Sequence, residues 1–317
     1  MELNKIYCMD NLELLKQLPD ESIDLIYCDI LYNTGKKFKD YNDNLGTPQQ
    51  AIEWYRPRLI EMKRVLKNNG NIVLQCDKNI SHYLKVEMDN IFKLNNFKNE
   101  IIWLRSNSGK TISKNIQNDL DSLIWYSKTS NGTFNNVYRP ISDSTLKLYN
   151  KDDGDGRGKY CSQTLRKPSN PTKGTKYDYI DNNGKVWKCP KTGWRMVEEK
   201  MRNLENDNRL ILTGKTLREK DYWNERKSTG KLINNLWDDI RNINGKKESV
   251  DYATQKPKEL LNRIIEMLSN KGDVVADFFC GSGTTMVVAK ELERKYIGCD
   301  INPRAIEITN KRLNECE

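Results

Sequence analysis

Apolar residues follow one another in two kinds of segment at both ends of the chain. Runs such as "SIDLIYCD" (22–29) and "GNIVLQCD" (70–77) are rich in aliphatic residues and have the length of buried β-strands. Longer segments with apolar residues at helical spacing, such as "TPQQAIEWYRPRLIEMKRVLK" (47–67), alternate with them. By the same criteria, strands are predicted at 4–10, 99–106, 273–280 and 295–300, and helices at 11–18, 81–93, 256–269, 284–294 and 302–315. This alternation predicts an α/β fold, a mostly parallel, doubly wound sheet with helices on both faces.

The middle of the chain has a different texture and carries the charge. Residues 129–247 contain 25 Lys and Arg against 15 Asp and Glu, whereas the rest of the chain contains 28 against 29. The net charge of +9 therefore arises in this segment, which is also rich in Gly, Asn and aromatic residues. We expect a core made of residues 1–128 and 248–317, with a smaller, basic domain at 129–247 that binds a polyanion. The alternative is a solvated, loop-rich domain that is basic by chance.

Composition excludes several kinds of chemistry. The eight cysteines include no C-x-x-C pair, which indicates reduced thiols and neither a disulfide framework nor a zinc site. His82 is the only histidine of the chain, so a His-based triad or a multi-His metal site cannot be built, and we expect no metal. No export signal pattern opens the chain and no apolar stretch has the length of a membrane span, which favours a cytoplasmic protein. Chemistry must then rely on carboxylates, backbone groups or a cofactor.

A glycine-containing turn follows the predicted strand at 273–280. In "DFFCGSGTT" (277–285), Gly281 and Gly283 allow a tight turn that leads into a helix, whose first N–H groups are free to bind a ligand. Asp300 ends the next strand, 23 residues after Asp277, where a carboxylate would meet ribose hydroxyls. The third glycine of a dinucleotide-binding turn is missing, and Asp277 would serve a pyrophosphate poorly. The pattern favours S-adenosylmethionine, whose tail is cationic, and the alternative is an ordinary turn between a strand and a helix.

Several motifs together resemble one family. "DFFCGSGTT" is similar to the cofactor motif D-P-F-C-G-S-G-T-T of the β-class site-specific DNA amino-methyltransferases, and "DILY" (29–32) occupies the place of their D-P-P-Y. "ATQKPKELLNRII" (253–265) and "LDSLIWYSK" (120–128) also resemble family segments, and the matches cover about 200 residues in the family's order. The resemblance implies a Rossmann-like methyltransferase sheet with an inserted target-recognition domain. It also implies S-adenosyl-L-methionine as cofactor and double-stranded DNA as partner.

The tetrapeptide is the expected catalytic site. An exocyclic amine of a base is a poor nucleophile, because its lone pair is delocalised into the ring, until acceptors hold its N–H groups. By resemblance, the Asp29 carboxylate and the Ile30 carbonyl would accept these hydrogen bonds, and Tyr32 would stack on a base flipped out of the duplex. The acidic first residue favours adenine N6 as the target, since the family more often shows serine for cytosine N4. A cytosine N4 methyltransferase stays an alternative.

The departure from the family pattern concerns the two central positions. Prolines would fix φ and stiffen the turn, whereas Ile30 and Leu31 are freer and have N–H groups that need partners. Either the surroundings hold the loop and the enzyme works, or this chain is a weakened or inactive methyltransferase-fold protein that binds DNA or supports a partner subunit. An RNA methyltransferase is a further alternative, although the basic insert resembles DNA readers better.

The resemblance extends to further positions. The methionine end of the cofactor would be surrounded by Asp277, Phe279, Gly281, Gly283 and Thr284. Asp300 would bind the ribose, Asp10 would meet the adenine amino group, and the cofactor carboxylate would lie near Thr254, Gln255 and Lys256. DNA contacts are expected from Lys36, Lys37, Lys39, Arg157, Lys159 and Arg195. Trp187 and Trp194 are either further DNA contacts or the core of the small domain. A second copy of the chain or a restriction-system partner is also possible.

Overall fold

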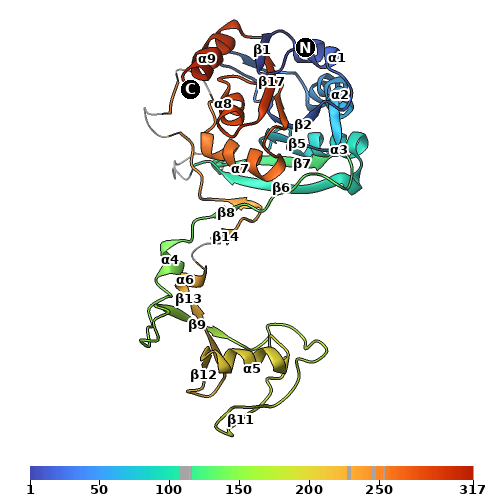
Figure 1. Cartoon of the computed structure of the whole chain (residues 1–317). Coiled ribbons are helices and arrows are strands. Elements are labelled where there is room, and N and C mark those ends of the chain that lie inside the picture. Colours follow the sequence, from blue (N-terminus) through green and yellow to red (C-terminus); the bar gives the residue numbers. More distant parts are fainter. Residues whose placement is uncertain are drawn as a thin grey trace. The chain divides into compact units, whose positions relative to one another are not determined.

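The chain divides into two compact units. The computed structural model describes residues 1–106, 114, 116–226, 230–243, 248–250, 252 and 254–316. Residues 1–137 and 233–317 form one unit, here called the core unit, and residues 138–232 form the other, the inserted unit (Figure 1). The sequence division instead placed the insert at 129–247. The second boundary of this predicted insert, residue 247, belongs to residues 244–247, which lie outside the described part.

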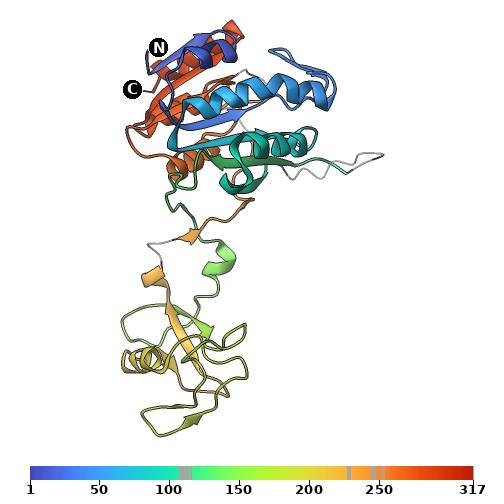
Figure 2. The ribbon, with the colours of Figure 1, turned by 90° about the vertical axis from the view of Figure 1, so that its right-hand side faces the viewer.

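The core unit is built on one eight-stranded sheet in the order β1-β17-β16-β2-β5-β7-β6-β15. These strands are β1 (Lys5–Cys8), β2 (Ile23–Asp29), β5 (Leu66–Cys76), β6 (Phe97–Leu104), β7 (Leu120–Ser127), β15 (Leu236–Trp237), β16 (Val274–Asp277) and β17 (Lys295–Asp300). Every neighbouring pair from β1 to β5 is parallel, and so are β6 and β15. Only the two pairs made by β7 are antiparallel within this sheet. The predicted mostly parallel sheet is confirmed (Figure 2).

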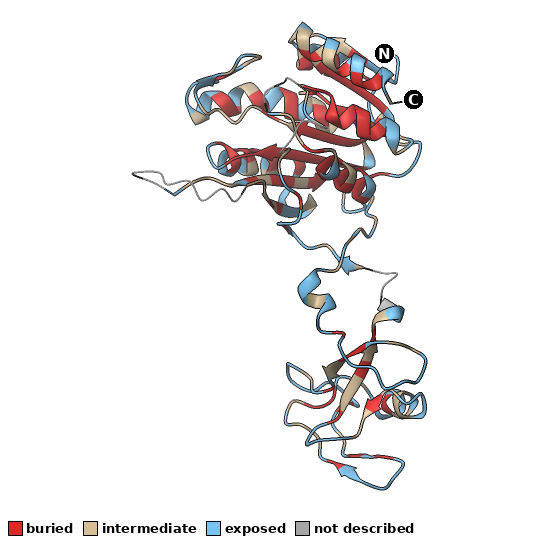
Figure 3. Ribbon diagram, turned by 90° about the vertical axis from the view of Figure 1, so that its left-hand side faces the viewer, coloured by how far each residue is buried: buried red, intermediate tan, exposed pale blue. Residues whose placement is uncertain are grey.

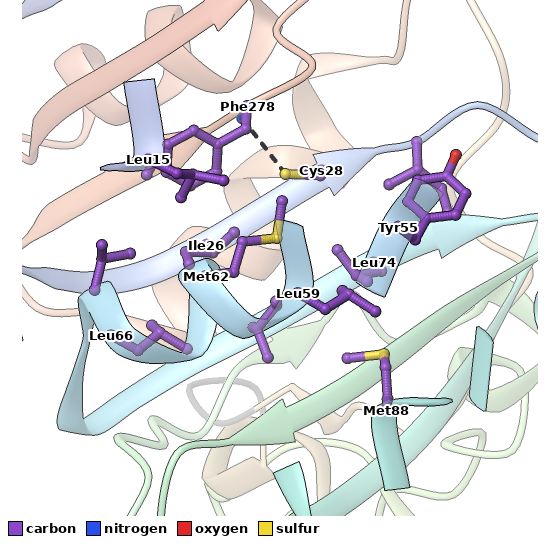
Figure 4. Packing of buried hydrophobic residues seen from close by; sticks show 14 of the residues in the cluster. Leu15, Ile26, Cys28, Tyr55, Leu59, Met62, Leu66, Leu74, Met88 and Phe278 are labelled. Carbon is purple, nitrogen blue, oxygen red and sulfur yellow. Dashed lines mark hydrogen bonds between the residues drawn. The ribbon is translucent and has the colours of Figure 1, made fainter. Parts of the chain in front are cut away.

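Helices cover both faces of this sheet, as the alternating pattern predicted. One face carries α1 (Asn11–Gln17), α2 (Pro48–Val65) and α3 (Ser81–Phe92), and the other carries α7 (Lys258–Leu268), α8 (Thr284–Glu291) and α9 (Pro303–Asn314). Leu59 and Met62 of α2 pack beside Ile26 and Leu74 of the strands (Figure 4). Adjacent strand residues belong to opposite clusters, which is why the central strands are mostly apolar and buried (Figure 3).

Smaller elements complete the core unit. Two short strands, β3 (Lys36–Lys37) and β4 (Asn42–Asp43), form a hairpin between β2 and α2, and a turn of 3-10 helix (Leu94–Asn96) follows α3. Thr47 begins α2 with a capping box, in which its hydroxyl accepts from the Gln50 N–H and the Gln50 side chain accepts from the Thr47 N–H. Among the described residues, no helix is both long enough and apolar enough to cross a membrane.

The inserted unit has its own small core. Its elements are β8 (Tyr138–Arg139), α4 (Asp143–Leu146), β9 (Tyr160–Thr164), β10 (Tyr179–Ile180), β11 (Val186–Trp187), α5 (Glu198–Asn206), β12 (Leu210–Ile211), β13 (Arg218–Tyr222), α6 (Trp223–Arg226) and β14 (Lys231–Leu232). Trp187 and Trp194 are buried in this core. Their indole N–H groups donate to the Asp181 carboxylate at 2.8 Å and to the Tyr177 carbonyl at 2.7 Å. Of the two alternatives for these tryptophans, the structure shows the core.

The chain leaves the core unit and returns to it at one point. The Ile233 N–H donates to the Val137 carbonyl at 3.2 Å, and both residues pack on the apolar cluster under α7. Within the inserted unit, β8 and β14 continue as an antiparallel pair. The two ends of residues 138–232 are therefore neighbours.

Candidate active site

Three acidic residues from separate strands meet at one edge of the core sheet. Asp29 ends β2, Asp277 ends β16 and Asp300 ends β17, and all three line a cavity of about 420 Å³ that lies wholly within the core unit. Parallel strands place their carboxyl ends at the same edge, where ligands of open α/β sheets bind. The cavity joins the "DILY" loop to the glycine turn.

The Asp29 carboxylate has a partner at each oxygen. Its Oδ1 accepts from the Tyr32 hydroxyl at 2.7 Å, and its Oδ2 forms an ion pair with the Lys256 ammonium. Burial raises the pKa of the Asp29 carboxyl, while Lys256 and the Tyr32 hydroxyl oppose this shift. Lys256 was expected beside the carboxylate of a cofactor, and in this structure it faces Asp29.

A buried polar network lies under Tyr32. The Tyr32 hydroxyl oxygen is 3.1 Å from Asp121 Oδ2 and accepts from Gln75 Nε2 at 3.2 Å. Asp121 also accepts from Arg105 Nε at 3.0 Å. The Tyr32 phenol has a pKa well above its usual range because it is buried beside two carboxylates. Tyr32 is therefore a neutral hydroxyl with its ring in the cavity.

Tertiary contacts replace the missing prolines of the loop. The Ile30 N–H donates to the Gln75 carbonyl at 3.3 Å, and the Ile30 side chain is buried in the core. The Tyr55 hydroxyl donates to the Leu31 carbonyl at 2.8 Å. The next residues are held by the buried Asp43 carboxylate, which accepts from the Asn33 and Thr34 N–H groups, each at 3.0 Å. These contacts hold the turn in the absence of prolines.

The glycine turn is shaped by both of its glycines. Gly283 has φ +73°, and a Cβ built on it would lie 2.1 Å from Thr309 Cγ2. Gly281 has φ +49° and would place a Cβ 3.2 Å from Tyr252 Cε1. The Gly281 N–H donates to Asp300 Oδ2 at 2.9 Å, so the turn and the next strand end are joined. Burial raises the pKa of the Asp300 carboxyl.

Asp277 is a fully buried acid of the cavity. It accepts from the Phe279 N–H at 2.9 Å and from the Thr285 hydroxyl at 2.6 Å. Burial raises its pKa to about 7, and the two hydrogen bonds oppose this shift. A buried carboxylate of this kind favours a cationic group beside it, which fits the ammonium and sulfonium groups of S-adenosylmethionine.

Two aromatic rings and Asp10 line a further part of the cavity. Asp10 begins α1, where its Oδ1 accepts from the Leu12 N–H at 2.8 Å and its Oδ2 pairs with Arg58 at 3.0 Å. The Arg58 guanidinium in turn lies 3.4 Å from the centre of the Trp54 ring, and that ring is 6.1 Å from Phe279. The rings of Trp54 and Phe279 both line the cavity, and together with Asp10 they suit a flat heterocycle such as adenine.

Thr254 and Gln255 also line the cavity. The Thr254 hydroxyl is 3.3 Å from the Tyr41 hydroxyl, and the Gln255 amide bonds the Val250 N–H and the Glu248 carbonyl, each at 2.8 Å. The Gln255 side chain thus holds the segment before α7. Within the described ranges, no group of three or more His, Cys, Asp or Glu side chains is arranged to hold a metal ion.

The comparisons with known proteins agree on one family. The family model described as DNA methylase matches residues 23–311. The chain belongs to this DNA methylase family. It is 31% identical over 303 residues to the type II methyltransferase M.EcaI of Enterobacter cloacae, covering 91% of this chain and 64% of M.EcaI. It is 27% identical to the type II methyltransferase M1.MboII of Moraxella bovis, covering 100% of this chain and 99% of M1.MboII.

Some relatives are longer and some solved structures share the fold. The chain spans less than two thirds of M.EcaI and about half of two type III restriction-modification Mod subunits, with 51% and 45% of their lengths covered. The solved PvuII cytosine-N4 DNA methyltransferase has a TM-score of 0.56 at 15% identity, covering 99% of this chain and 87% of that one. The Rossmann-like methyltransferase fold expected from the sequence is confirmed.

The basic residues expected to contact DNA differ in exposure and in their ion pairs. Lys36 and Lys37 form the exposed strand β3, and Lys39 is exposed in the same hairpin. In the inserted unit, Lys159 and Arg195 are exposed, whereas the Arg157 guanidinium forms a two-armed ion pair with the half-exposed Asp207. Arg157 would have to exchange this carboxylate for a phosphate.

Several residues that surround "DILY" in the folded chain were not predicted from the sequence. They are Asp43, Tyr55, Gln75, Arg105 and Asp121. A signal existed for two of them, because Gln75 in "GNIVLQCD" and Asp121 in "LDSLIWYS" are polar residues at the ends of apolar strands. Buried polar groups need partners, and such positions indicate a site at the strand end.

Proposed function

We propose that this DNA methylase transfers a methyl group from S-adenosyl-L-methionine to N6 of adenine in double-stranded DNA. The observation that carries the proposal is that Asp29, with Lys256 as counter-charge, shares one cavity with Asp277, Asp300 and the glycine turn. An acceptor for an amine and a site for a cationic nucleoside are thereby side by side.

The cofactor site is proposed from the chemistry of its donors. Asp300 accepts from the ribose hydroxyls, and Asp277 faces the cationic methionine end together with Gly281, Gly283 and Thr284. Asp10 borders the adenine with Phe279, which was expected at the methionine end and lies beside Trp54. Thr254, Gln255 and Lys256 border the same end. When bound, the cofactor supplies a methyl group on a cationic sulfur, which is the electrophile.

The residues of "DILY" act on the substrate amine. Asp29 accepts one N–H of the adenine N6 group and the Ile30 carbonyl accepts the other, which concentrates electron density on the nitrogen. Tyr32 stacks on the flipped base, so that the nitrogen is held in line with the methyl group. As the N–C bond forms, the nitrogen loses a proton, and Asp29 is the base within hydrogen-bond reach.

Adenine is favoured over cytosine by the acidic first residue of the tetrapeptide. Among the relatives, YhdJ of Escherichia coli is a DNA adenine methyltransferase that is 26% identical, with 96% of this chain and 81% of YhdJ covered. The basic inserted unit supports a role in holding DNA. The similarity to type III restriction-modification Mod subunits supports a restriction-system partner.

Methyl transfer to unmethylated bacterial DNA tests this function. Tritium-labelled S-adenosylmethionine is incubated with the protein and the DNA, and the DNA is digested to nucleosides and separated. We expect label in N6-methyladenine and at least a roughly 100-fold lower rate for Asp29→Ala. Label in N4-methylcytosine would overturn the adenine assignment. Label only from an Ile30→Pro/Leu31→Pro variant would show that the natural loop is inactive, and label from neither would overturn the function.

A further inference from the structure

The Tyr32 hydroxyl lies between two carboxylates. Its oxygen is 2.7 Å from Asp29 Oδ1 and 3.1 Å from Asp121 Oδ2. A hydroxyl has one proton to donate, so it can serve only one of these acids at a time. The shorter distance places the proton on the side of Asp29 in this structure.

Because of the orientation of Gln75, the Tyr32 hydroxyl can donate its proton only to a carboxylate. The Asp121 carboxylate can only accept, so the Gln75 atom that lies 2.9 Å from its Oδ2 is Nε2, and Gln75 Oε1 accepts from the Tyr27 hydroxyl at 2.7 Å. Its Nε2 then donates both to the Tyr32 oxygen at 3.2 Å and to Asp121 Oδ2 at 2.9 Å. The Tyr32 oxygen is thus already an acceptor, and its proton must point to a carboxylate.

Asp121 is held as a ready acceptor. Its side chain is 2% exposed, and Arg105 Nε donates to its Oδ1 at 3.0 Å. Gln75 bonds its other oxygen, so the carboxylate is fixed from both sides. The ion pair and the Gln75 bond keep this buried carboxylate charged, and its Oδ2 lies 3.1 Å from the Tyr32 hydroxyl oxygen.

The substrate creates a conflict at Asp29. This step rests on the proposed function, in which the adenine amine donates to Asp29. Oδ2 of Asp29 is paired with Lys256, so Oδ1 is the oxygen left for the amine, which would share it with the Tyr32 hydroxyl, and the two donors would weaken each other's hydrogen bonds. Displacing a buried hydroxyl without a new acceptor would leave it unsatisfied, which is unfavourable.

We propose that Asp121 is a positioning residue that accepts the Tyr32 hydroxyl hydrogen bond when the adenine amine occupies Asp29. The hydroxyl proton turns from one carboxylate to the other while the oxygen and the ring keep their places. No covalent bond forms or breaks in this exchange. Asp29 becomes free to accept from the substrate, and Tyr32 keeps its ring in the stacking position.

A double-mutant cycle between Asp121 and Tyr32 tests the exchange. The variants are Asp121→Asn, Tyr32→Phe and the double variant. Asp24→Asn is the matched control, because Asp24 is a buried acid at the opposite end of β2 that is paired with Lys67 at 2.8 Å. Single-turnover methyl transfer to unmethylated bacterial DNA and the affinity for S-adenosylmethionine are measured for each.

We expect Asp121→Asn to slow single-turnover transfer about tenfold, with cofactor affinity within about twofold of the natural protein. In the Tyr32→Phe background the same change has no further effect on the rate, because the hydroxyl that needs Asp121 is gone. Asp24→Asn leaves the rate unchanged in both backgrounds. If Asp121→Asn lowers the folded fraction, Asp121→Glu, which keeps the charge for Arg105 and displaces the acceptor oxygen, repeats the cycle.

Equal slowing by the Asp121 change in both backgrounds would overturn the exchange and leave the proposed function intact. So would a loss of cofactor affinity that Asp24→Asn shares, because the effect would then be one of general packing. Absence of transfer by the natural protein would overturn the proposed function and the exchange with it.

Discussion

Lys256 is the residue through which a distant segment acts on Asp29. Its ammonium donates to Asp29 Oδ2 and to the Thr254 carbonyl, the latter at 3.1 Å, and lies 5.7 Å from the centre of the Tyr32 ring. Burial favours the protonated form of Asp29, and Lys256 is the largest opposing influence. Lys256 is therefore the cation that most favours the ionised form of Asp29.

Lys256→Met should move the acid limb of the pH–rate profile to higher pH. Asp29 accepts from the substrate only when it is ionised, so activity falls as the pH falls through its pKa. Without Lys256, burial raises that pKa further, and we expect the limb to move to higher pH. The single-turnover rate is measured from pH 5.5 to 9.

A matched control for this prediction is Lys258→Met, which removes a lysine paired with the half-exposed Glu291. Its profile should coincide with that of the natural protein. An unchanged acid limb in Lys256→Met would mean that Lys256 does not set the ionisation of Asp29.

At the scale of elements, the turn between β16 and α8 depends on two glycines with different surroundings. Gly283 begins α8 in the left-handed region, directly against Thr309 of α9. Gly281 faces the edge of the Tyr252 ring, where the space is larger. The same substitution at the two positions should therefore have unequal effects.

Gly283→Ala should destabilise the protein more than Gly281→Ala. A Cβ at position 283 meets Thr309 at 2.1 Å in addition to the strain of the left-handed conformation, and we expect a loss of about 2–4 kcal/mol. At position 281 the contact is 3.2 Å, and we expect about 1–2 kcal/mol. Urea unfolding measures both, and equal losses would contradict the role assigned to Thr309.

Regular elements of the core were predictable, because strands buried on both faces are mostly apolar and helices have apolar residues along one side. The acids at strand ends were predictable for a related reason, since the carboxyl ends of parallel strands share one edge. The short strands β3, β4 and β15 were not predicted, because two residues carry no period.

Contacts between distant residues were also beyond the sequence pattern. Nothing in "DILY" shows that the Tyr55 hydroxyl donates to the Leu31 carbonyl. In the sequence, Tyr55 is only one of the apolar positions of a predicted helix. Lys256 was expected to face a cofactor, and only the folded chain shows Asp29 beside it. Ion pairs of this kind depend on how α7 packs on the sheet, which no local spacing encodes.

For the whole molecule, the insertion point is the feature that matters most. The core unit is made of two stretches of chain, and the Ile233 N–H bonds the Val137 carbonyl at 3.2 Å where they meet. The cavity is lined by residues of both stretches and by none of the inserted unit. The core unit thus holds the whole proposed chemical site.

Replacing residues 138–232 by a short Gly-Ser turn should leave a folded core that binds cofactor. We expect affinity for S-adenosylmethionine within about threefold of the full chain, because closing a short turn between adjacent ends costs little. DNA binding should be lost, and for the full chain it should weaken steeply with salt. Calorimetry and a gel-shift titration measure the two, and DNA binding by the shortened chain would contradict the role of the insert.

The single bonded junction at Val137 and Ile233 also bears on how such enzymes diversify. A segment that departs and returns through neighbouring residues can be exchanged for another of different length without shifting the register of any catalytic strand. Under the proposed function, recombination at this junction would exchange the DNA-binding segment and leave the residues of the chemical site in place. Chimeras that carry the inserted unit of a relative between these two residues would be the direct way to change the DNA sequence that is bound under the proposed function.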